Sequence, residues 1–143
     1  LVYAEDFEYE FVIGKAIEIA IGSDLNFIAT GMGVYSAVQA ARKLEEEHGL
    51  SVGVIDMHTI KPLDKETVLK YATRCKKVLT IEEHSVIVGL GDAVADAIIG
   101  HGDFAFRKLG IQDQFGQSGT PAQLLEVYGL SDAQILEAAK EMF

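Results

Sequence analysis

Acidic and histidine side chains gather at two places in this sequence where they could carry out acid–base chemistry. The first is the run Glu82-Glu83-His84, and the second pairs Asp56 with His58. Carboxylates and imidazoles are the groups that most often transfer protons in enzymes. Successive residues of a strand point to opposite faces, so Glu82 and Glu83 are not expected to form a close carboxylate pair. His84 is a candidate base, but such a histidine more often holds a loop or lies in an interface, and we assign no catalytic residue.

The other reactive side chains form no known catalytic or metal-binding pattern. The four histidines lack the spacing of zinc ligands, and no Ser-His-Asp arrangement can be assembled. The single cysteine, Cys75, follows Arg74 and precedes Lys76 and Lys77, which could lower the pKa of its thiol. We favour a small, partly buried side chain at the end of a helix, because no motif surrounds Cys75. We therefore expect no metal ligands.

A glycine turn, Gly31-Met32-Gly33, follows an apolar segment and opens a helical pattern, and Asp56 ends the next apolar segment about 20 residues later. This layout is close to that of a dinucleotide-binding unit, in which the turn admits a pyrophosphate and the acid holds a ribose. Ser36 replaces the third glycine of that pattern. A tight turn that lets the helix lie close to the sheet is the favoured interpretation. Nucleotide binding and anion binding at the helix N-terminus stay open as alternatives.

Strand and helix patterns alternate along the chain and must position these residues. Apolar periodicity predicts five strands, at residues 15–21, 25–30, 51–56, 78–82 and 104–111. Helices are predicted at residues 34–48, after the capping residue Asp64, at residues 90–99, and after Thr120 and Ser131, which both begin capping-box patterns. The alternation indicates an α/β fold with a mainly parallel sheet and helices on both faces. The turn between the first two strands is too short for a helical crossover.

Size and composition indicate one domain, and they exclude some classes of partner. The chain has 143 residues, a net charge of −10 and one cysteine. The negative charge argues against nucleic acid and anionic membranes as partners, and the single cysteine indicates a reducing, cytoplasmic setting. Residues 1–13 are acidic and aromatic, so we expect a linker or a leading segment there and a domain at residues 14–143. The first residues look like a cut inside a longer protein, so we expect the activity to belong to a larger chain.

Several motifs resemble the C-terminal domain of transketolases, and they occur in the same order. They are Asp56 to Asp64 (DMHTIKPLD), Ile81 to Ser85 (IEEHS), Gly89 to Ala95 (GLGDAVA), Gly110 to Gly119 (GIQDQFGQSG) and Tyr128-Gly129-Leu130. The likeness extends from about Gly14 to the end of the chain. It is strongest to the separate C-terminal subunit of split transketolases. The corresponding domains of deoxyxylulose-phosphate synthase and of 2-oxoacid dehydrogenase E1 β subunits come next.

The resemblance implies a three-layer α/β/α sandwich around a five-stranded mixed sheet of order 1-3-2-4-5, with strand 1 antiparallel. It implies a structural and dimerisation domain of a thiamine-dependent transferase that moves a two-carbon ketol unit between sugar phosphates. Thiamine diphosphate and Mg²⁺ would lie between two preceding domains, so no cofactor-binding residue is assigned to this chain. The implied partners are those thiamine-binding domains, or a subunit that carries them, in a homodimer or a heterotetramer.

In that strand order, a crevice between the second and fourth strands is bordered by residues 30–36 and 82–91. We expect an interface or a small-anion site at this edge, formed by Gly31, Gly33, Ser36, Glu82, Glu83, His84, Gly89 and Gly91. A second hypothesis, from another class, is a free-standing nucleotide- or anion-binding regulatory module. It would use Gly31, Gly33, Ser36 and Asp56.

Overall fold

The centre of the molecule is a five-stranded mixed sheet of order β1-β3-β2-β4-β5. The computed structural model describes residue 3 and residues 5–143. The strands are β1 (Ile17–Ala20), β2 (Leu25–Ala29), β3 (Val52–Asp56), β4 (Lys77–Ser85) and β5 (Ala105–Ile111). Strand β1 is antiparallel to β3, and the other neighbouring pairs are parallel. The expected strand order and orientation are therefore confirmed.

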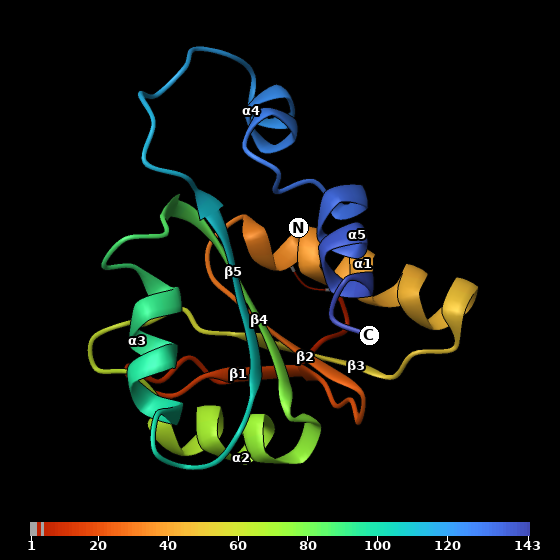
Figure 1. Cartoon of the computed structure of the whole chain (residues 1–143), viewed down its shortest axis with the longest axis vertical. Coiled ribbons are helices and arrows are strands. Elements are labelled where there is room, and N and C mark those ends of the chain that lie inside the picture. Colours follow the sequence, from red (N-terminus) through yellow and green to blue (C-terminus); the bar gives the residue numbers. More distant parts are fainter. Residues whose placement is uncertain (1–2, 4) are drawn as a thin grey trace.

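Helices cover both faces of this sheet and make three layers (Figure 1). They are α1 (Gly33–His48), α2 (Lys65–Cys75), α3 (Leu90–Ile98), α4 (Pro121–Val127) and α5 (Asp132–Lys140). Helices α1 and α5 pack on one face, α2 and α3 pack on the other, and α4 lies beyond the end of β5 (Figure 1). Within the described residues, every helix is too short or too polar to cross a membrane.

The two helical layers rest on two separate apolar cores. Strands β2 and β3 are buried along their whole length, as expected for parallel strands that are covered on both faces. Phe27 of β2 points into the core under α1 and α5, and its neighbour Ile28 points into the core under α2 and α3. Because this chain covers both faces of its own sheet, it has the cores that an independently folding domain requires.

Local caps fix where three of the helices begin. The Asp64 carboxylate accepts a hydrogen bond from the Thr67 N–H at 3.2 Å and another from the Ala16 N–H at 3.0 Å. Burial acts to raise the pKa of this carboxyl, but these hydrogen bonds outweigh burial and lower it. Thr120 and Ser131 both complete capping boxes, at the starts of α4 and α5. These three helix starts are confirmed.

Strands β4 and β1 differ most from the extents that the sequence pattern predicts. Strand β4 continues past Glu82 to Ser85, because Ser85 pairs with Ile111 of β5 after an irregularity in the register. Strand β1 is shorter than predicted, and its register with β3 shifts between Glu18 and Ala20. In the leading segment, residues 5–13 contain neither helix nor strand, and residues 1, 2 and 4 lie outside the described part. The domain boundary at residue 14 stays a prediction.

Candidate functional site at the carboxyl edge of the sheet

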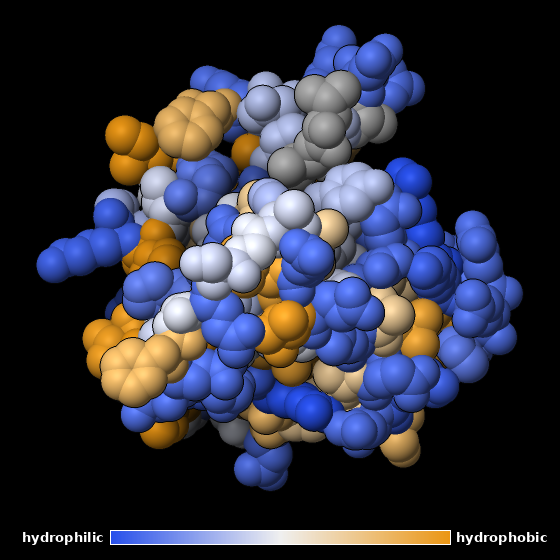
Figure 2. Space-filling view, turned by 90° about the horizontal axis from the view of Figure 1, so that it is seen from above, coloured by the Kyte–Doolittle hydropathy of each residue, from blue (hydrophilic) through white to orange (hydrophobic). Residues whose placement is uncertain are grey.

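The carboxyl ends of β2 and β4 lie side by side, but the helices that follow them go to opposite faces. Strand β2 leads to α1 on one face, and β4 leads to α3 on the other. Such a topological switch point is where open α/β sheets usually bind ligands or partners. Figure 2 views the molecule from the end toward which β5 runs, and hydrophobic residues are interspersed there with hydrophilic ones.

Glu82 is fully buried at this edge, where it caps α3. Its Oε2 accepts a hydrogen bond from the Leu90 N–H at 2.7 Å, and its Oε1 accepts one from the Gly91 N–H at 2.8 Å. A carboxylate at this position pairs free helix N–H groups and complements the helix dipole. A Cβ at Gly89 would collide with this carboxylate. The second glycine turn is therefore shaped by the approach of Glu82, and Glu82 has no access to a substrate.

Glu83 has the corresponding role on the opposite face. Its Oε1 accepts a hydrogen bond from the Met32 N–H at 3.2 Å, just before α1. Gly31 has a φ of +59°, and a Cβ there would collide with the Glu83 carboxylate. Gly33 lies against Ile81, which lets α1 pack close to β4. As expected from the alternation of a strand, the two glutamates point to different helices and form no acid–base pair.

The carboxylates at the two turns do not suit a phosphate-bearing group. A pyrophosphate that approached Gly31 would meet Glu83, and one that approached Gly89 would meet Glu82. Like charges at such short range oppose binding. The turns therefore do not fit the diphosphate of thiamine diphosphate or of a nucleotide. Within residue 3 and residues 5–143, no group of three His, Cys, Asp or Glu side chains could hold a metal ion.

The remaining candidate residues are spread out. His84 is exposed, and its Nδ1 lies 3.3 Å from the Ser85 carbonyl oxygen. Ser36 is buried in α1. His84 and Ser36 thus lie apart from the other candidates. Those that contact each other form two clusters, one of Gly31 and Glu83 and one of Glu82, Gly89 and Gly91.

Asp56 and His58 also lie at this edge, at the end of β3. Asp56 is 7% exposed and accepts a hydrogen bond from the Tyr3 hydroxyl, and the ring of His58 lies 4.4 Å from that of Phe11. Burial raises the pKa of the Asp56 carboxyl, although the Tyr3 hydrogen bond and the nearby His58 act to lower it. The leading segment thus covers these two residues, beside a cleft of about 480 Å³ that is also lined by Thr30, Gly31, Met32 and Glu83.

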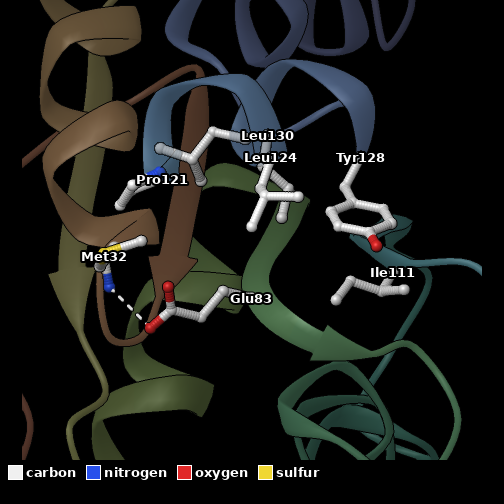
Figure 3. A pocket seen from close by; sticks show the side chains of 8 residues that line it. Met32, Glu83, Ile111, Pro121, Leu124, Tyr128 and Leu130 are labelled. Atoms are coloured by element: carbon white, nitrogen blue, oxygen red, sulfur yellow. Dashed lines mark hydrogen bonds between the residues drawn. The ribbon is translucent and has the colours of Figure 1, made fainter. Parts of the chain in front are cut away.

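An apolar pocket that sequence reasoning missed lies next to this cleft, between α4 and the ends of β4 and β5 (Figure 3). Its volume is about 210 Å³, and it is lined by Met32, Glu83, Ile111, Pro121, Leu124, Leu125, Tyr128 and Leu130. Leu124 of α4 and Tyr128, the residue that follows α4, are four residues apart, and both side chains point into the pocket (Figure 3). This spacing of apolar residues is the sequence signal that could have indicated an apolar face of α4, but it does not indicate where α4 packs.

Lys108 of β5 holds the loop between β4 and α3. Its Nζ donates to the Val86 carbonyl at 2.9 Å and to Asp92 Oδ1 at 2.6 Å, while Asp92 Oδ2 accepts from the Val88 N–H at 2.6 Å. The hydrogen bond from Lys108 lowers the pKa of the Asp92 carboxyl. These contacts fix a loop in which Val88 points outward with a φ of 62°. The loop therefore presents an apolar side chain at the same edge.

Cys75 is buried, and its Sγ lies 3.4 Å from the Gly22 carbonyl oxygen. Burial raises the pKa of its thiol, against the effect of Arg74. The predicted position of Cys75 as a buried side chain at the end of a helix is confirmed, and burial outweighs the effect of Arg74 on the thiol pKa.

Three comparisons with known proteins agree with this architecture. The sequence model of the transketolase C-terminal domain matches residues 14–135. The chain is 38% identical over 133 residues to the 6-deoxy-6-sulfo-D-fructose transketolase subunit SqwH of Clostridium sp. (strain MSTE9), covering 93% of this chain and 41% of that protein. It is 36% identical over 133 residues to 1-deoxy-D-xylulose-5-phosphate synthase of Halothermothrix orenii, covering 91% of this chain and 21% of that protein.

A solved structure described as a split gene transketolase, inactive beta4 tetramer, superimposes with a TM-score of 0.88. It is 37% identical in sequence, and the match covers 99% of this chain and 46% of that chain. This chain thus spans less than half the length of these three relatives. The motifs, the strand order and these matches together show that the chain belongs to the transketolase C-terminal domain family.

Proposed function

We propose that this chain is the structural and assembly domain of a thiamine-diphosphate-dependent transketolase. The whole enzyme would be a transferase that moves a two-carbon ketol unit between sugar phosphates. The observation that carries this proposal is the burial and hydrogen bonding of Glu82, which is fully buried at the candidate edge. Both of its carboxylate oxygens are bonded to the backbone of α3, so this acid stabilises a helix and is not free for chemistry.

Thiamine diphosphate and Mg²⁺ belong, in this proposal, to the part of the enzyme outside this chain. The cofactor carries the difficult bond-breaking chemistry in such enzymes, and the protein supplies binding and orientation. Glu82 and Glu83 stand at the two glycine turns of this chain, which supports a cofactor site elsewhere. The same negative charge disfavours the alternatives of a small-anion site and of a nucleotide-binding regulatory module.

The carboxyl edge is proposed as an interface. Large apolar side chains that are exposed there include Met32, Tyr35, Val88 and Phe115. Apolar residues that gather on one face of a domain are typical of association surfaces. The solved relative is described as a β4 tetramer and another relative as a transketolase subunit. By analogy, this domain joins thiamine-binding domains or a thiamine-binding subunit and also self-associates, giving a homodimer or a heterotetramer.

Deoxyxylulose-phosphate synthase is the second candidate for the parent enzyme, because one such synthase is 36% identical to this chain. A 2-oxoacid dehydrogenase E1 β subunit is a third candidate on family resemblance. The buried contacts described above serve any of these parents equally well. We also propose a cytoplasmic location, since the single cysteine is buried and unpaired, as is common in reducing compartments.

Reconstitution tests the proposed function. The 143-residue chain alone should show no transfer between sugar phosphates, and adding the thiamine-binding part of the protein as a separate polypeptide should restore it. Replacing the exposed His84 with alanine should affect assembly more than turnover. Turnover by the chain alone, or a large loss of turnover in His84→Ala with assembly intact, would contradict the proposal. Saturable binding of ATP or ADP would instead support the regulatory module.

A further inference from the structure

The motif DMHTIKPLD at residues 56–64 spans the connection from the end of β3 to the start of α2. The sequence offered Asp56 and His58 of this motif as acid–base groups, but the start of the chain covers both of them in the structure. We call Tyr3 together with residues 5–16 the entry segment. This segment contacts the motif along nearly the whole length of the motif.

The end of the entry segment nearest β1 is held through its backbone. The Gly14 N–H donates a hydrogen bond to Thr59 Oγ1 at 3.0 Å, and the Ala16 N–H donates one to Asp64 Oδ2 at 3.0 Å. Gly14 has a φ of +82°, and a Cβ there would lie 2.9 Å from Pro62 Cγ. The backbone of the entry segment therefore passes directly along the motif at this end.

The other end of the entry segment is held by aromatic side chains. The Tyr3 hydroxyl donates a hydrogen bond to Asp56, and the ring of Phe11 lies 4.4 Å from that of His58. The ring of Tyr9 lies 4.6 Å from that of Tyr3. Aromatic pairs of this kind stabilise a contact beyond the area that they bury. The contacts follow the same order along both segments, so the two segments run side by side in the same direction.

We propose that residues 56–64 form a docking track for the polypeptide that enters the domain. The track holds the entry segment at both ends and brings Tyr3 to the carboxyl edge of the sheet, where Tyr3 lines the cleft together with Gly31 and Glu83. The inference deepens the proposed function and rests on it in one respect, namely that thiamine-binding domains precede this one. The track then tethers those domains at the carboxyl edge.

The part of the entry segment between its two aromatic contacts provides a way to measure docking. Aromatic and acidic residues alternate at residues 7–11 (FEYEF), and Glu8 and Glu10 are exposed. Both glutamates lie between the contact of Tyr3 and that of Phe11. A protease that cuts after glutamate has to draw this stretch away from the track. The rate of cleavage therefore reports the population of undocked segment.

Limited proteolysis of the 143-residue chain with endoproteinase Glu-C is the first experiment. The reference is a synthetic peptide of residues 3–16, which has no track to bind. We expect cleavage after Glu8 and Glu10 to be at least about tenfold slower in the chain than in the peptide. Cleavage of the two at equal rates would show that the segment is not docked, and the proposal would be wrong.

Substitutions on both sides of the contact should speed this cleavage. Tyr3→Phe removes a hydrogen bond to a carboxyl group and should raise the rate by about fivefold or more. His58→Ala removes the ring beside Phe11 and should raise it by about threefold or more. The matched control is Ile13→Ala, because Ile13 lies in the same segment and is 71% exposed. The rate for this control should stay within about twofold of that of the unmodified chain.

Two further rates separate docking from a general loss of stability. Phe11→Ala combined with His58→Ala should be cut at about the rate of the faster single variant, since both changes remove the same contact. Cleavage after the exposed Glu46, which lies inside α1, should not change in any variant. An equal rise in cleavage at Glu46 would mean that the variants loosen the whole fold, and it would count against the track.

Disulfide trapping is the second experiment and does not depend on a loss of contact. The double variant Phe11→Cys/His58→Cys should form an intramolecular disulfide under mild oxidation, because the two native rings are neighbours. The control pair Phe11→Cys/Ile99→Cys uses an exposed site at the end of α3 and should not form one. The native Cys75 is buried and does not compete. Failure of the first pair to cross-link, or equal rates for the two pairs, would overturn the docked arrangement.

Failure of the track and failure of the proposed function can be told apart. Both experiments use the 143-residue chain and require no transferase activity. If the segment proves to be docked but reconstitution yields no ketol transfer, the track stands and the proposed function is wrong. If reconstitution succeeds but the entry segment is cut at the rate of the free peptide, the proposed function stands and the track is wrong.

Discussion

The carboxylate of Glu82 and the backbone N–H of Leu90 form a buried hydrogen bond of 2.7 Å that joins the end of β4 to the start of α3. The second oxygen of the same carboxylate pairs with the Gly91 N–H. The strand that brings the acid to the sheet edge thus also fixes the helix that follows it. In the sequence, acids next to a histidine at the end of a strand, as in Glu82-Glu83-His84, suggest a catalytic group. The hydrogen bonds of Glu82 show instead that its carboxylate stabilises the start of α3.

Loss of this cap should destabilise the domain. Glu82→Ala removes both acceptors and leaves two helix N–H groups buried, so we expect unfolding to become easier by about 2–4 kcal/mol. Glu82→Gln keeps one acceptor and should lose less. The control is Glu83→Ala, which removes an exposed carboxylate and should cost about 1 kcal/mol or less. Urea denaturation followed by circular dichroism measures the three values. Equal losses for Glu82→Ala and Glu83→Ala would contradict the assignment.

The second glycine turn should tolerate no side chain. In Gly89→Ala the new Cβ would overlap the Glu82 carboxylate, so the cap and α3 must move apart. We expect a loss of about 2 kcal/mol or more, together with a lower helix content. Gly116→Ala is a matched control, because a Cβ at Gly116 meets nothing within 4 Å. It should change stability by about 0.5 kcal/mol or less. Thermal unfolding of both variants is a sufficient measurement.

Asp56 should make stability fall as pH rises. Its pKa is raised above the ordinary 3.8 in the folded state, chiefly by burial, so the folded chain binds a proton that the unfolded chain has already released. From about pH 4 up to the native pKa, this group therefore removes stability. The Asp56→Asn side chain stays neutral and can still accept a hydrogen bond from the Tyr3 hydroxyl. The free energy of unfolding of this variant, relative to that of the unmodified chain, should therefore increase through this pH window and then level off. Urea unfolding midpoints of both proteins between pH 4 and pH 8 measure this change. A difference in midpoint that does not vary with pH would contradict the prediction.

Cys75 should be inert in the folded protein. Burial raises the pKa of its thiol, so less of the reactive thiolate is present at a given pH. We expect Ellman's reagent to label the native chain at least about a hundredfold more slowly than the urea-unfolded chain. Rapid labelling of the native protein at pH 8 would show that the basic residues around Cys75 control its reactivity after all.

Features set by local chemistry could be predicted well from the sequence. Asp64 caps α2, and Thr120 and Ser131 start α4 and α5, because each cap depends on residues within one helical turn. The strand order could not be derived from periodicity and came from the family resemblance. The alternation of β4 correctly separated Glu82 from Glu83, since a strand has a period of two residues.

Features that depend on distant packing could not be predicted. The pattern placed Ser36 in a candidate site because it replaces a glycine of a known motif, but Ser36 faces the interior of the protein. The cap formed by Glu82 depends on the close approach of Gly89, and the apolar pocket depends on where α4 docks. Strand β4 runs past its predicted end because β5 offers a partner after a register shift, which no local signal in β4 indicates.

Neighbouring glutamates of one strand hold the beginnings of two helices on opposite sides of the sheet. A sideways pull on the end of β4 would therefore be transmitted to α1 and α3 at the same time. A protein that binds this edge and displaces the end of β4 would therefore act on the helical layers of both faces at once.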